Sequence, residues 1–148
     1  MQVVISLLII AASLVLFAYW FRYSCLLILS TQTTQDYTGV VAKASGMSLL
    51  DMQAQLEQGG GYDLAAVQRS MQADYQRVTR LLAKAPGLEA HLSASERIIL
   101  RLDYRLMQLY ARITARRHPD QAREALLEQC AILSHFANAA GCAGVLRA

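Results

Sequence analysis

The residues that could support catalysis or metal binding are few and widely spaced. The histidines His91, His118 and His135 fall in different segments, and the three cysteines form no Cys-x-x-Cys pair. A metal site needs ligands at short fixed spacings, and nucleophilic catalysis needs a base beside the nucleophile. Neither pattern is readable, so the sequence predicts no metal site, no cofactor and no enzyme. An enzyme whose site is assembled from residues far apart in sequence is the last-ranked alternative.

A glycine triplet, Gly59 to Gly61, is the only stretch that suggests a phosphate-binding loop. Such a loop needs a strand before the glycines and Lys-Ser or Lys-Thr after them. Tyr62 and Asp63 follow instead. The triplet therefore predicts a break between two helices and not a nucleotide site.

A group of arginines lies on one flank of a predicted helix that runs from Ser93 or Ser95 to about Arg117. Successive residues turn by about 100° around a helix axis, which brings the group into one sector about 100° wide. The candidate interaction stripe consists of Arg97, Arg101, Arg105, Arg112 and Arg116. Guanidinium groups bind phosphate and carboxylate bidentately, so this stripe could bind anionic lipid headgroups or an acidic partner. The preferred interpretation is structural, with arginine stems covering the helix edge and their charges meeting acids on neighbouring helices.

Asp74 is predicted to be buried, because it lies between Val67 and Leu81 on the inner face of a helix over residues 64–84. A solitary buried carboxylate is costly and should have a partner. Folding that helix back on the next one brings Asp74 level with Arg105, or with Arg101 as the alternative. We expect a structural ion pair of Asp74 with Arg105 and not a catalytic acid.

The rest of the chain is organised around its apolar N-terminal segment. Between Val3 and Trp20 the only polar side chains are Ser6 and Ser13, so the segment is apolar on every side. Its 18 residues rise roughly 27 Å as a helix, which is about the thickness of a bilayer core. The sequence predicts a transmembrane anchor over residues 1–30. A cleavable signal peptide is the alternative, but it would need a basic start and a small-residue cleavage site.

Aromatic rings and a positive charge mark the membrane interface at the end of this span, at Tyr19, Trp20, Arg22 and Tyr23. Basic residues follow the span and none precedes it, so the positive-inside rule predicts an N-terminus outside and the remainder in the cytoplasm. The expected location is a bacterial-type inner (cytoplasmic) membrane.

The rest of the chain has the composition and periodicity of an all-α domain. Residues 31–46 are predicted to extend the membrane helix, and residues 47–148 to form a small antiparallel bundle of three main helices and one short one. The apolar seam of the third helix is predicted at Ile99, Leu102, Leu106, Leu109 and Ile113, which repeat at the spacing of a coiled coil. Leu100 is predicted to point away from this seam.

These patterns predict a location and an architecture more clearly than a function. The leading hypothesis is a non-enzymatic accessory, assembly or scaffold subunit of a membrane complex that binds a protein partner or a second copy of itself. The alternative is a regulator that faces anionic membrane lipid through the arginine stripe. A net charge of +3 without any nucleic-acid-binding motif argues against DNA or RNA as a partner.

Overall fold

A computed structural model describes residues 1–31, 35–85 and 87–145. The chain divides into two compact units, Met1–Gln32 and Thr33–Ala148, which we describe separately. In the described residues every regular element is a helix, which confirms the predicted all-α class. The order is α1 (Gln2–Ser30), α2 (Thr38–Ala44), α3 (Leu49–Glu57), α4 (Leu64–Lys84), a 3-10 turn η1 (Leu88–Ala90), α5 (Ala94–Thr114) and α6 (Pro119–Val145).

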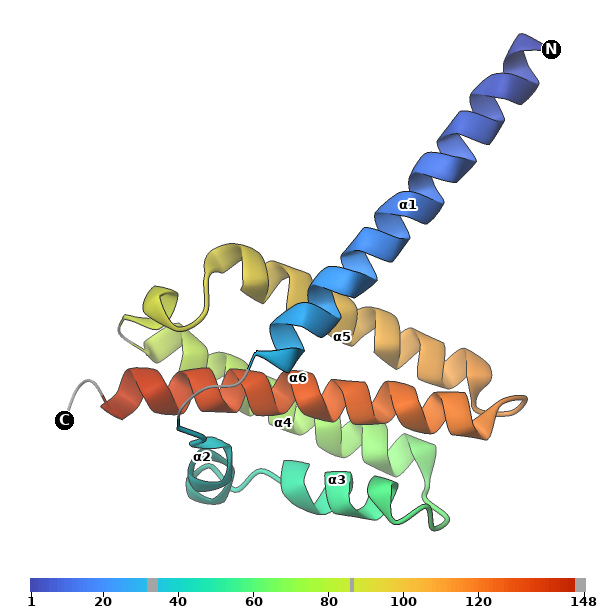
Figure 1. The fold of residues 1–148 in the computed structure, drawn as a ribbon. Helices are drawn as coiled ribbons and strands as arrows, with labels where there is room; N and C mark the ends of the chain where they lie inside the picture. The colour runs from blue at the N-terminus through green and yellow to red at the C-terminus, as the bar shows by residue number, and fades with distance from the viewer. Residues whose placement is uncertain (32–34, 86, 146–148) are drawn as a thin grey trace. The chain divides into compact units, whose positions relative to one another are not determined.

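The first unit consists of one long helix, α1, which is drawn in blue in Figure 1. It is long and apolar enough to cross a membrane, judged by length and composition. Two of its serine hydroxyl groups donate back to the helix backbone: Ser13 Oγ to Ile9 O at 2.8 Å and Ser24 Oγ to Trp20 O at 2.9 Å. A polar side chain that makes its hydrogen bond within its own helix can lie in an apolar environment at little energetic cost.

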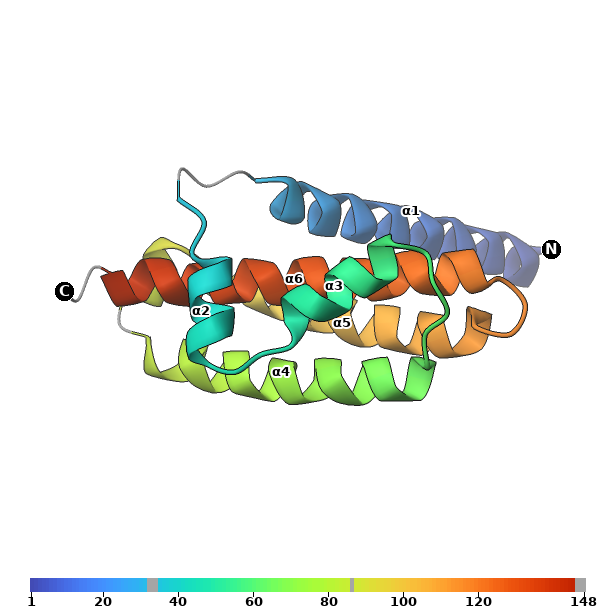
Figure 2. The ribbon, with the colours of Figure 1, turned by 90° about the horizontal axis from the view of Figure 1, so that it is seen from below.

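The second unit is a bundle built around α6 (Figures 1 and 2). Helices α4 and α5 run antiparallel to each other, and α6 packs against both, while the short helices α2 and α3 also pack on α6. Buried side chains therefore occur around most of α6. Small residues on that helix, such as Ala125, Ala137 and Ala143, let its neighbours approach closely.

Local sequence signals define the ends of the main helices. Asp63 caps α4 by accepting a hydrogen bond from the backbone of Ala65 at 3.0 Å. Ser93 and Glu96 form a reciprocal capping box at the start of α5. Pro119 occupies the first position of α6, where its missing N–H costs nothing.

The helix predicted to continue from the membrane span does not form. Helix α1 ends at Ser30, and α2 is a separate helix that belongs to the second unit. Two polar contacts bind it to α6: the Tyr37 backbone N–H donates to Asn138 Oδ1 at 2.7 Å, and Thr38 Oγ1 donates to Ser134 O at 3.2 Å. The segment predicted as a juxtamembrane extension thus contributes to the bundle.

Helix α6 continues through Gly141 and ends at Val145. Gly141 is needed for a close contact between two helices. A Cβ atom there would collide with Tyr37 Cβ and would lie 3.0 Å from Val41 Cγ2. The absence of a side chain therefore lets α2 approach α6.

The predicted seam of α5 is on the wrong side of the helix. Leu100, Tyr104 and Ala111 are buried, whereas the predicted seam residues Leu102 and Leu106 are 49% and 42% exposed. Helical periodicity alone cannot tell which of two apolar faces enters the core. The buried side of α5 is broader because it combines Leu100 and Tyr104 with the buried polar residues Asp103 and Thr114.

Candidate functional site

The outward side of α5 is an apolar surface that no other described element of the bundle covers. We call it the α5 outer face and define it by the residues Ile98, Leu102, Leu106, Leu109 and Ile113. Their exposed fractions range from 42% to 67%. They repeat every three or four residues along the helix, so their side chains form one continuous strip. Isolated exposed leucines are common on proteins, but a strip of five is a typical interaction surface.

The arginine stripe borders this strip. Arg101, Arg105, Arg112 and Arg116 are exposed, while Arg97 is half-buried. The carboxylate partners expected on neighbouring helices are not found: among the described residues no ion pair joins any of the five arginines to an acid. The α5 outer face is therefore bordered by positive charge that no acid of the described chain neutralises.

Arg112 has a neutral partner that fixes its direction. Its Nε donates to Gln68 Oε1 on α4 at 3.1 Å, and Gln68 Nε2 donates to the Gln108 backbone carbonyl at 3.2 Å. These contacts hold the Arg112 side chain toward α4 without neutralising its charge. Arg105 lies closer to the apolar strip around the helix than Arg112 does, and Arg101 lies slightly farther from it.

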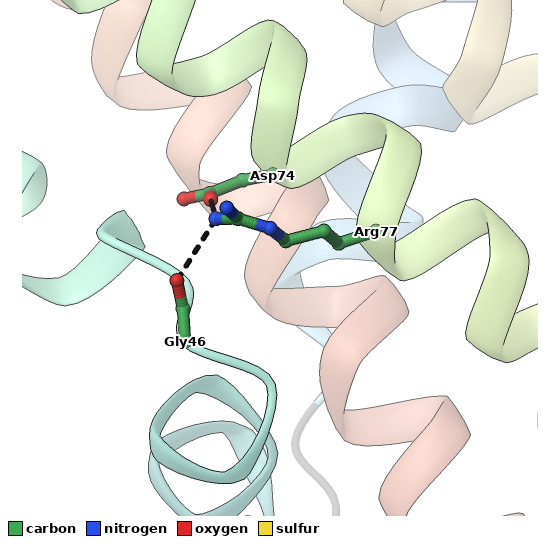
Figure 3. A network of polar contacts seen from close by, with 3 residues as sticks. All are labelled: Gly46, Asp74 and Arg77. Atoms are coloured by element: carbon green, nitrogen blue, oxygen red, sulfur yellow. Dashed lines mark hydrogen bonds and ion pairs between the residues drawn. The ribbon is translucent and has the colours of Figure 1, made fainter.

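Asp74 is fully buried, as its position on α4 predicted, but its ion pair is with Arg77 and not with Arg105. Arg77 Nη1 lies 3.1 Å from Asp74 Oδ1 and also donates to the Gly46 carbonyl at 2.8 Å (Figure 3). The prediction assumed a partner on the next helix, whereas the partner is the arginine one turn along the same helix. Arg105 is exposed on α5.

The pKa of Asp74 is raised, with burial as the main cause. The Arg77 charge and the backbone N–H groups of Ser48 and Leu49 act in the opposite direction and lower this pKa. Ser48 is the N-cap of α3 and Leu49 its first residue, and the Ser48 side chain makes no capping hydrogen bond. The carboxylate thus stands where the partial positive charge of a helix N-terminus favours an anion.

Other polar side chains gather in the core between α4, α5 and α6. The Tyr75 and Tyr104 rings stack with centroids 4.5 Å apart, and Gln129 Nε2 donates to the Tyr104 backbone carbonyl at 3.3 Å. Burial raises the pKa of the Cys130 thiol to about 12 and also raises the pKa of the Tyr104 hydroxyl. Both groups are protonated at neutral pH, so neither offers a nucleophile or a base.

Among the described residues, neither the histidines nor the glycine triplet forms part of a recognisable catalytic or metal-binding site. His91 and His118 are exposed, while His135 is half-buried and has a pKa lowered by burial, with Glu96 opposing that shift. In the described part of the chain no three potential ligands come together for a metal ion. Gly59 to Gly61 line a cleft whose cation, Arg123, lies 3.7 Å from Asp120.

The four predicted interface residues lie together on α1. Trp20 packs edge-to-face on Tyr19 and on Tyr23, with ring centroids 6.3 Å and 6.0 Å apart. Arg22 lies within the same turn and a half of helix. A cluster of this composition is typical of a headgroup region.

Comparison with known proteins adds no further assignment. No protein-family model matches the chain, and neither a curated protein nor a solved structure matches it.

Proposed function

We propose that this protein is a membrane-anchored, non-enzymatic interaction module, with α1 as the anchor, the bundle in the cytoplasm and the α5 outer face as its binding surface. The observation that carries the proposal is the strip of large apolar side chains on α5, exposed by 42% to 67% in a bundle that already has a complete core. Continuous exposed apolar strips are aggregation-prone unless something covers them. In an accessory or scaffold role, the protein would dock this strip on another component of the membrane, which would cover it.

The surrounding chemistry supports binding over catalysis. Asp74 is paired with Arg77, and the Cys130 thiol is buried with a pKa of about 12. The α5 outer face carries no His, Cys, Asp or Glu that could act on a substrate. It offers area and charge, which are what a partner needs for docking.

The proposal predicts that the α5 outer face is covered in the native membrane. Hydroxyl-radical footprinting of intact membranes measures side-chain access in place. Leu106 on α5 and Leu50 on α3 form a matched pair, because both are leucines and their exposed fractions are 42% and 44%. We expect Leu106 to be oxidised much more slowly than Leu50.

Equal oxidation of Leu106 and Leu50 in native membranes would show that nothing covers α5 and would refute the proposal. A second matched pair, Ile113 at 67% and Val40 at 68% exposed, guards against a local effect at one residue. Both α5 members of the two pairs should be protected together.

A further inference from the structure

The α5 outer face is bordered by arginines and by no exposed acid of α5, and this charge indicates what covers it. Resting on the proposed function, we propose that its occupant is the anionic surface of the same bilayer that α1 crosses. The apolar strip would lie at the boundary between headgroups and acyl chains, with its arginines reaching lipid phosphates. The strip from Ile98 to Ile113 extends roughly 22 Å along the helix, at about 1.5 Å per residue.

The order of residues around α5 fits an interfacial helix. The apolar strip points directly away from the bundle, opposite the buried residues Leu100 and Ala111. Arg101 and Arg105 follow on its edge, where long side chains can reach outward while their stems lie along the apolar strip. Helices of this type lie in the membrane plane, with the apolar side sunk by about 5 to 10 Å.

Charge complementarity favours lipid over a second copy of this chain. The only acids on α5 are Glu96, which bonds to the backbone of Ser93, and Asp103, which is buried. The α5 outer face of one copy therefore offers no exposed carboxylate to the arginines of another. Two antiparallel copies would also bring Arg105 and Arg112 of both chains to the same side of the contact, where like charges repel. Anionic headgroups supply the missing negative charge.

The short connection between the two units keeps any membrane that α1 crosses close to the bundle. From Ser30, the last residue of α1, to Thr38, the first of α2, a fully extended chain covers at most about 29 Å. A bilayer crossed by α1 would thus always lie within reach of the bundle. Tethering raises the effective concentration of a surface, so weak contacts become sufficient.

A single-tryptophan variant in lipid nanodiscs tests the inference on the full chain. Trp20→Phe removes the native tryptophan, and Leu106→Trp places a reporter on the strip, with Leu50→Trp as the matched control on α3. Each variant is first checked for an unchanged thermal unfolding midpoint. The discs contain phosphatidylglycerol with phosphatidylcholine, or phosphatidylcholine alone, each with and without bromine on the acyl chains.

We expect bromine to quench the fluorescence of the Leu106→Trp reporter in the phosphatidylglycerol discs and to leave the Leu50→Trp reporter bright. Quenching should fall in phosphatidylcholine alone. It should also fall with Arg101→Gln plus Arg105→Gln, but not with Arg69→Gln plus Arg80→Gln, which remove two exposed charges from α4. High salt should weaken it as well, because the screening length falls from about 10 Å at 0.1 M to about 3 Å at 1 M.

The inference would be overturned by equal quenching of the two reporters, by quenching that does not depend on lipid charge, or by protection of position 106 that requires two chains in one disc. If Leu106 is protected from oxidation in native membranes but its tryptophan variant is not quenched in pure lipid discs, the occupant is a protein. That outcome refutes the lipid assignment and leaves the proposed function intact.

Discussion

Arg77 and Asp74 lie one turn apart on α4, and their ion pair fastens that helix to the chain segment before α3. The same Arg77 nitrogen that lies 3.1 Å from the Asp74 carboxylate donates to the Gly46 carbonyl at 2.8 Å (Figure 3). Gly46 follows α2 with a left-handed φ of 64°, a conformation that glycine adopts without strain. The pair therefore stabilises a turn that is distant in sequence.

A double-mutant cycle measures this coupling. Arg77→Gln leaves a fully buried carboxylate without its cation, so we expect it to lower the free energy of unfolding by about 1 to 3 kcal/mol. The combination of Asp74→Asn with Arg77→Gln should cost less than the sum of the two single changes, because the second change removes the stranded charge. Thermal unfolding of the full chain in mild detergent gives the values. Strict additivity would mean that the pair contributes no coupling.

The same carboxyl predicts a pH dependence. The folded pKa of Asp74 lies above its ordinary value of 3.8, so the native state binds this proton more tightly than the unfolded chain does. The contribution of Asp74 to the free energy of unfolding is most favourable below the pKa that this carboxyl has in the unfolded chain. It is lost as the pH rises through the pKa in the folded protein. Relative to Asp74→Asn, the native protein should therefore lose stability as the pH rises from just below 3.8 through the raised pKa. Parallel stability curves of the two proteins would contradict this assignment.

The two sides of α5 predict opposite responses to truncation. Leu100→Ala removes a fully buried side chain and should cost about 2 to 5 kcal/mol, whereas Leu106→Ala on the exposed strip should change stability by about 0.5 kcal/mol or less. The melting temperatures of the two variants show which of these two leucines contributes more to stability. A larger loss at Leu106 would restore the seam that the sequence pattern predicted.

Two glycines of α6 form a matched pair for the α2 contact. Gly141→Ala places a methyl group against Tyr37 and Val41 and should be destabilising, while at Gly144 nothing lies within 4 Å of the added Cβ. Gly144→Ala should instead stabilise the protein slightly, by at most about 0.5 kcal/mol, because alanine is the better helix former but the position is next to the end of α6. Thermal unfolding of both variants provides the comparison. A stabilising Gly141→Ala would show that α2 does not approach α6 so closely.

The sequence predicted those elements whose signals are local. The start of α4 after Asp63, the start of α5 at Ser93, which was one of two candidate serines, and the apolar length of α1 each follow from a few adjacent residues. The all-α class follows from the same signals.

Features that depend on which faces meet could not be predicted. Leu102 and Leu106 have perfect seam spacing, but Leu100 and Tyr104 form a second apolar face, and only the packing of α6 selects between them. One sequence signal did favour the observed choice. Arg101 and Arg105 border the Leu102 side, and two charges along an apolar strip place it more readily at a surface than in a core.

The ion pair of Asp74 was mispredicted for a related reason. Arg77 and Arg105 are both plausible partners by register, and the choice depends on the turn at Gly46, whose carbonyl draws the Arg77 guanidinium inward. Nothing in the spacing of charges along α4 and α5 encodes that turn.

The proposed function depends on α1 remaining in the membrane, and alkaline carbonate extraction tests this most directly. Membranes from cells expressing the chain are washed with high salt and then with carbonate, and the mass of the retained protein is measured. We predict that the bundle stays in the pellet on a chain that still carries α1, because its apolar run spans a bilayer core. A soluble bundle released on a chain that begins after Trp20 would identify α1 as a cleaved signal and contradict the proposed function.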